Sequence, residues 1–83
     1  MEFLLVIFDG TREVIVDEAP LGRTNIVLDL ERGVHTVTLG PPRDFSPVSQ
    51  TVHLENTAPL DPCRIVFQRL PPSAIPHSPG TPA

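Results

Sequence analysis

The chain contains no Lys, no Trp and no Tyr, and these absences exclude several kinds of chemistry. Without Lys there is no P-loop lysine, no Schiff-base nucleophile and no Ser/Lys dyad. The six basic residues are all Arg, they stand singly along the chain among ten acidic residues, and the net charge is −4. Because no basic patch forms, we do not expect nucleic acid as a partner.

Candidate metal ligands and nucleophiles are also few. The single cysteine, Cys63, cannot form an internal disulfide, and its apolar neighbours favour a core or rim position over a nucleophilic role. The strand pattern places His35 on an aliphatic face and His53 on a polar one, while His77 lies near the C-terminus. A metal site needs at least three side-chain ligands that converge, and the sequence pattern brings no such set together. We therefore predict no metal site, no cofactor and no catalytic residue.

Long apolar runs are absent as well. The N-terminal run, residues 3–8, has six apolar residues between Glu2 and Asp9. A secretion signal needs a positive start and roughly 7–15 apolar residues, and a membrane-spanning helix needs about 20. The chain as given therefore predicts a cytoplasmic protein without membrane insertion, or an extracytoplasmic one if it was cut from a larger exported protein.

What the chain does have is the pattern of β-strands. Aliphatic residues alternate with polar ones between turn residues, and this predicts six short strands: residues 3–8, 13–17, 25–30, 34–39, 48–55 and 63–69. The strand at 3–8 is apolar on both faces, which places it near the middle of a sheet. Asp9 and Gly10 follow it and predict a hairpin to the strand at 13–17.

Proline and glycine mark the remaining segments. Residues 18–22 contain Pro20 and Gly22 and predict a turn. The segment Gly40 to Pro47 holds three prolines and predicts a loop from which Phe45 folds back onto the edge of the core. The last thirteen residues hold five prolines, which predicts a disordered tail.

The predicted fold is therefore all-β, a small and mostly antiparallel β-sandwich of six or seven short strands. The sandwich occupies residues 1–70 as a single domain, because 83 residues are too few for a second independent core. Residues 71–83 form the Pro-rich tail.

The middle of the chain, about Val14 to Leu54, resembles the PEGA domain, a small β-sandwich module. The pattern is an Asp at a strand end, a turn with Gly and then Thr, alternating aliphatics, a second Gly turn and a further alternating strand. The matching positions are Asp17, Gly22, Thr24, Ile26, Leu28, Leu30, Gly33, His35, Val37 and Leu39, with an aromatic at Phe45 in the next loop. The Pro-Glu-Gly-Ala signature is absent, Glu18 stands where a turn Gly is common, and Asn25 replaces the usual Pro after Thr24.

This resemblance implies a non-catalytic module for binding or spacing in surface-associated or extracytoplasmic multidomain proteins. We therefore predict a non-enzymatic protein- or glycan-binding or assembly module, whose partner is another protein or a second copy of the chain. The apolar run 3–8 favours self-association, because both of its faces are apolar and are stabilised by burial from water. The alternative is a regulatory or inhibitor subunit that presents the loop Gly40 to Pro47 to an enzyme, with Arg43 and Phe45 as partner-binding anchors. A small hydrolase that uses His35, His53 or Cys63 is a third and weaker hypothesis.

Overall fold

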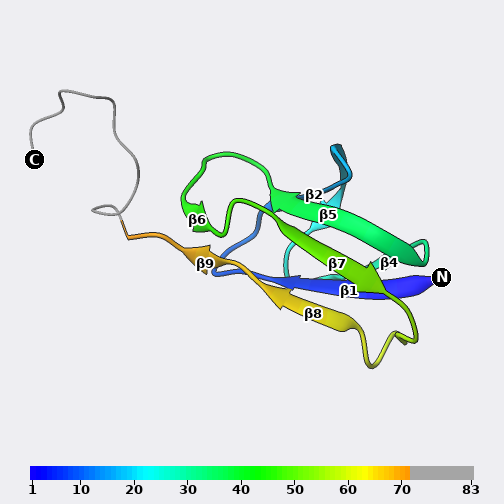
Figure 1. Cartoon of the computed structure of the whole chain (residues 1–83). Helices are drawn as coiled ribbons and strands as arrows, with labels where there is room; N and C mark the ends of the chain where they lie inside the picture. Colours follow the sequence, from blue (N-terminus) through cyan, green and yellow to red (C-terminus); the bar gives the residue numbers. More distant parts are fainter. Residues whose placement is uncertain (72–83) are drawn as a thin grey trace, which may run out of the picture.

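The computed structural model describes residues 1–71 and confirms the prediction of an all-β fold (Figure 1). Within these residues the chain forms nine strands: β1 (Glu2–Ile7), β2 (Glu13–Val16), β3 (Ala19–Arg23), β4 (Val27–Leu30), β5 (Gly33–Leu39), β6 (Phe45–Ser46), β7 (Gln50–Leu54), β8 (Cys63–Val66) and β9 (Gln68–Arg69). This part of the chain has no helix long and apolar enough to cross a membrane. Apart from Pro71, the predicted Pro-rich tail lies outside the described residues.

Two sheets form the sandwich. One has three strands in the order β4-β1-β8, the other has four in the order β3-β2-β5-β7, and β6 and β9 form a small two-stranded sheet beside them. β1 pairs with β8 in parallel and every other pairing is antiparallel, which confirms the predicted mostly antiparallel arrangement. The apolar strand β1 is the central strand of its sheet, as its two apolar faces predicted.

The predicted hairpin between the first two strands is wrong. β1 and β2 belong to different sheets, and the residues between them cross from one sheet to the other. Thr24 holds this crossing in place: its hydroxyl accepts the Arg12 N–H at 2.9 Å and donates to the Gly10 carbonyl at 2.8 Å. The side-chain amide of Asn25 donates to the Phe8 and Gly10 carbonyls as well. Because these bonds hold the residues after β1, the Asp9-Gly10 turn does not lead β2 back along β1.

The segment 18–22, predicted as a turn, is mostly a strand. The turn is made one step earlier by Asp17 and Glu18, whose φ angles are 50° and 71°. Two successive positive φ angles suit a two-residue hairpin, so Ala19 to Arg23 pair with β2. Pro20 is tolerated there because β3 is an edge strand.

The predicted last strand, residues 63–69, is divided at Phe67. β8 pairs with β1, whereas β9 pairs with β6, which lies inside the predicted loop Gly40 to Pro47. Phe67 is 2% exposed, and its N–H bonds to the Ile7 carbonyl at 2.9 Å. The division lets one segment contribute to the sandwich and also anchor the loop.

One apolar core fills the space between the sheets. Its members are Leu4, Val6, Phe8, Val14, Val16, Leu28, Leu30, Val37, Leu39, Phe45, Val52, Leu54, Ile65 and Phe67. The Phe45 ring packs edge-to-face against Phe8 and Phe67, with centroid distances of 6.4 and 5.7 Å. This confirms that Phe45 folds back onto the core, and Cys63 lies partly buried against the same cluster.

Candidate functional site

The two described histidines differ in burial as predicted. The His35 side chain is 14% exposed, and its ring nitrogens lie 2.7 Å from Asp17 Oδ2 and 2.7 Å from the Glu31 carbonyl oxygen. The His53 side chain is 60% exposed and lies 3.1 Å from Glu55. No group of three His, Cys, Asp or Glu side chains within residues 1–71 is placed to hold a metal ion, and His77 lies beyond that range.

The His35–Asp17 pair has the composition of a catalytic dyad but not an open geometry. The hydrogen bond to Asp17, followed by the one to the Glu31 carbonyl, raises the pKa of His35. The Thr36 N–H, at 2.9 Å, followed by His35, lowers the pKa of Asp17. Both ring nitrogens thus face protein oxygens, which leaves neither of them directed at a substrate. The pair links the β2–β3 turn to β5, and the bond to the Glu31 carbonyl extends the link to the β4–β5 connection.

This pair predicts a pH-dependent contribution to stability. Because the folded pKa of His35 is raised, its contribution is complete below the ordinary value of about 6.5 and is lost as the pH rises through the folded value. Because the pKa of Asp17 is lowered, its contribution is present above about 4 and is lost as the pH falls through the folded value. We therefore expect the stability difference between the wild type and His35→Gln to be largest between pH about 4 and 6.5 and to shrink at alkaline pH.

Urea denaturation of both proteins at a series of pH values measures this difference. His53→Gln, which removes a largely exposed imidazole, is the matched control. Its free energy of unfolding should fall at alkaline pH in the same way as that of the wild type. A constant difference between wild type and His35→Gln from pH 5 to 9 would contradict the pairing.

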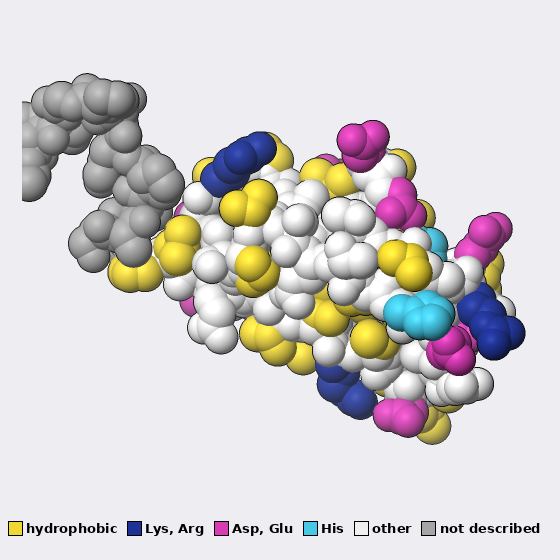
Figure 2. Space-filling view, viewed as in Figure 1, with side chains coloured by type: hydrophobic (Ala, Val, Ile, Leu, Met, Phe, Trp, Pro, Cys, Tyr) yellow, Lys and Arg dark blue, Asp and Glu magenta, His cyan; other side chains and the backbone are white. Residues whose placement is uncertain are grey.

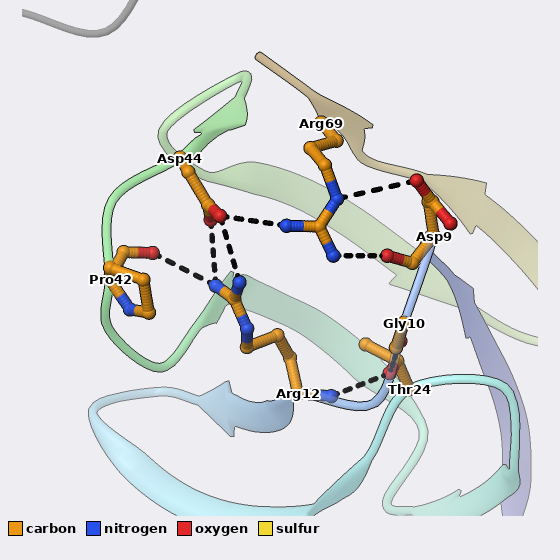
Figure 3. A network of polar contacts seen from close by, with 7 residues as sticks. All are labelled: Asp9, Gly10, Arg12, Thr24, Pro42, Asp44 and Arg69. Atoms are coloured by element: carbon orange, nitrogen blue, oxygen red, sulfur yellow. Dashed lines mark hydrogen bonds and ion pairs between the residues drawn. The ribbon is translucent and has the colours of Figure 1, made fainter. Parts of the chain in front are cut away.

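The charged residues of the opposite end of the sandwich form a network (Figure 3). The Arg12 guanidinium donates to both carboxylate oxygens of Asp44 at 2.8 and 2.9 Å and to the Pro42 carbonyl at 2.9 Å. Arg69 donates to Asp44 at 2.8 Å and also bonds to the carboxylate and the carbonyl of Asp9. The bonds from Arg12 are the main cause of the lowered pKa of Asp44.

This network joins three segments that are distant in the sequence: the β1–β2 crossing, the loop Gly40 to Pro47, and β9. The guanidinium carbons of Arg12 and Arg69 also lie 5.2 and 4.9 Å from the centroid of the Phe8 ring. The Leu70 N–H bonds to the Asp44 carbonyl at 2.8 Å, which fixes the loop from its other side. The network therefore braces the loop, and its charges are satisfied within the protein.

A groove runs beside the braced loop. It encloses about 490 Å³, within the range of ligand-binding pockets. Its lining is mostly apolar: Ile15, Leu39, Pro41, Phe45, Val48 and Leu70. Thr38 and Arg43 supply the polar side chains. A smaller cavity of about 280 Å³ lies beside His35 and Asp17 at the other end of the sheet.

The two predicted partner-binding residues, Arg43 and Phe45, both line this groove, but in different ways. Arg43 is exposed and makes no ion pair with the described residues. Phe45 is 6% exposed, so its ring forms part of the buried wall and offers little surface of its own. The cation of Arg43 and the apolar wall around it are thus the accessible features.

The sequence did not reveal the Arg12–Asp44–Arg69 network, because its members are separated by 25 and 32 residues and carry no local motif. It also did not reveal that Ile15 and Leu70 complete the groove. Comparison with protein-family models, with curated proteins and with solved structures finds no match to this chain.

Proposed function

We propose that the protein is a non-catalytic binding module that holds an extended segment of a partner protein in the groove beside the loop Gly40 to Pro47. The observation that carries the proposal is the apolar groove with the exposed Arg43 at its rim. An apolar side chain of the segment fills the groove, and an adjacent carboxylate pairs with Arg43. The PEGA-like relationship is part of the same proposal, since it implies a binding or spacer role.

Preorganisation supports this proposal. The loop is held by Arg12 and by the Leu70 N–H, and its Phe45 is packed into the core. A groove that exists before binding costs little ordering entropy when a partner segment enters it.

The distribution of charge supports an acidic segment. In Figure 2 most of the acidic side chains of this face, with basic ones among them, lie toward the end away from β6, whereas one basic side chain and several apolar side chains lie at the end where Figure 1 places β6. A partner carboxylate at the groove therefore meets a cation and few competing acids.

A protein segment fits the groove better than a glycan. The side chains that line it include two that can hydrogen-bond, Thr38 and Arg43, and the Thr38 hydroxyl already donates to the Val48 carbonyl at 2.6 Å. Sugar hydroxyls would find few partners on such a surface, whereas aliphatic side chains would find many.

The bracing of the loop also favours the second candidate function, a regulatory or inhibitor subunit. In that case the rigid loop inserts into a cleft of a partner enzyme, with Arg43 leading. The two functions differ in the role of the groove floor: Ile15 contacts the partner in the first case and not in the second.

Binding to a peptide array tests the proposed function. The probes are extended peptides in which a central Leu is followed by Asp, Asn or Lys. We expect the Asp series to bind best, and Arg43→Glu to lower affinity for it about tenfold and to shift the preference toward Lys, because the charge at the rim is reversed.

Arg23→Glu is the matched control, since Arg23 is an exposed arginine of the edge strand β3 that does not line the groove. Ile15→Glu should abolish binding of all three series, because it places a charge in the apolar floor. Equal binding of the Asp and Lys series, or binding that survives Ile15→Glu, would contradict the proposal.

A further inference from the structure

The outer face of the three-stranded sheet carries a stripe of apolar side chains. Phe3, Leu5 and Ile7 alternate with the buried residues of β1 and are half-buried. Val27 of β4 and Val66 of β8 flank them and are 38% and 48% exposed. Because these side chains remain partly exposed, no element within residues 1–71 fully covers this face.

The two edge strands add one charge each, and the charges are opposite. Asp29 of β4 lies beside Phe3 of β1, and Arg64 of β8 lies beside Leu5 of β1. Arg64 also has Asp61 at 3.6 Å, but both side chains of that pair are largely exposed, at 52% and 85%, so the interaction is weak. An apolar stripe between an acid and a base is a surface that can complement itself.

We propose that this face binds the same face of a second copy of the chain, with a two-fold axis that runs along β1. Such an axis places the β4 of one copy over the β8 of the other, so that Asp29 meets the Arg64 of the partner at both edges. Leu5 then packs on Leu5, and the stripe is buried between the two copies. The inference does not depend on the groove at the loop Gly40 to Pro47, which lies elsewhere on the molecule.

The register of the strands is compatible with this pairing. Phe3 is opposite Asp29 and Leu5 is opposite Arg64, so the two charged residues are offset by two positions along β1, or about 7 Å. The long arginine side chain spans this offset. A two-fold axis perpendicular to the strands would instead place β4 over β4 and β8 over β8 of the second copy. That arrangement brings Arg64 onto Arg64 and is repulsive.

The size of the face sets the expected strength. Three short strands make an interface at the lower end of the range for specific complexes, so the dimer is in a concentration-dependent equilibrium with the monomer. The same covering of β1 stabilises a thin core, because it removes apolar surface from water.

Sedimentation equilibrium of the full chain over a series of concentrations tests the inference. We expect a monomer–dimer equilibrium in the wild type and a monomer for Val27→Glu at every concentration. Val34→Glu is the matched control: Val34 is 65% exposed on the four-stranded sheet, and its replacement should leave the equilibrium unchanged.

The charge pair has its own test. Asp29→Arg and Arg64→Asp should each raise the dimer dissociation constant about tenfold or more, and the double variant Asp29→Arg/Arg64→Asp should restore the wild-type value within about threefold. Circular dichroism of each variant shows whether the fold is retained. A wild type that stays monomeric, or a double variant weaker than either single one, would overturn the inference, and neither result would affect peptide binding at the groove.

Discussion

Phe67→Ala is expected to lower the free energy of unfolding by about 3–5 kcal/mol, the usual loss for removing a buried aromatic ring. Phe67 is 2% exposed and lies between β8 and β9, where its ring contacts Phe45 edge-to-face at a centroid distance of 5.7 Å. Its removal leaves a cavity at the junction of the sandwich and the small β6–β9 sheet. Small domains have little stability in reserve, so we expect part of the population to be unfolded at 37 °C.

Urea denaturation followed by circular dichroism measures this effect. Phe67→Leu keeps most of the volume and should cost less than about 1.5 kcal/mol. Leu60→Ala is the control for the loss of an apolar side chain without a cavity, since Leu60 is 95% exposed. A loss below about 1 kcal/mol for Phe67→Ala would show that the ring does not pack as described.

Thr24→Val is expected to lower the free energy of unfolding by about 1–3 kcal/mol, although the two side chains have nearly the same shape. Thr24 is 2% exposed, and its hydroxyl bonds to both the Arg12 N–H and the Gly10 carbonyl. The valine methyl group cannot replace these bonds. The Gly10 carbonyl keeps the amide of Asn25 at 3.2 Å, so the Arg12 N–H is the group left unpaired.

Thr24→Ser distinguishes the contribution of the hydroxyl to stability from that of the methyl group. Serine keeps the two hydrogen bonds and loses one buried methyl, which costs about 1 kcal/mol. We therefore expect serine to be the milder replacement, as judged by the midpoints of urea denaturation. A valine variant as stable as the wild type would mean that the crossing between β1 and β2 does not depend on this hydroxyl.

The alternation of aliphatic and polar residues predicted which residues of a strand share a face, but not where each strand ends: Ile26 and Val48 continue the aliphatic faces of their predicted strands and are 56% and 65% exposed. In β2, β5 and β7 every second residue is buried over at least part of the strand, and the buried ones are aliphatic residues of the alternating pattern, such as Val14, Val37 and Leu54. Alternation with a period of two assigns side chains to faces, but it does not say which strands are neighbours. β1 shows the limit, because a strand that is apolar on both faces fits many partners, and its pairing with β4 and β8 was not predicted.

The position of the candidate site was predicted only in part. Three prolines marked the loop Gly40 to Pro47, and its two large side chains, Arg43 and Phe45, do line the groove. Two further parts of the wall, Ile15 in β2 and Leu70 just after β9, come from segments that are distant from the loop in the sequence. Residues that are far apart in the sequence but adjacent in the fold form no local sequence motif, so they could not be predicted to line the same groove.

The proposed binding of a partner segment in the groove beside Arg43 can be mapped residue by residue in solution. A titration of the ¹⁵N-labelled full chain with the Leu-Asp peptide, followed by amide chemical shifts, tests it most directly. We expect shifts that cluster at Ile15, Thr38, Arg43 and Val48 and leave Asp17 and His35 unchanged. Shifts centred on the cavity beside His35, with the groove unchanged, would contradict it.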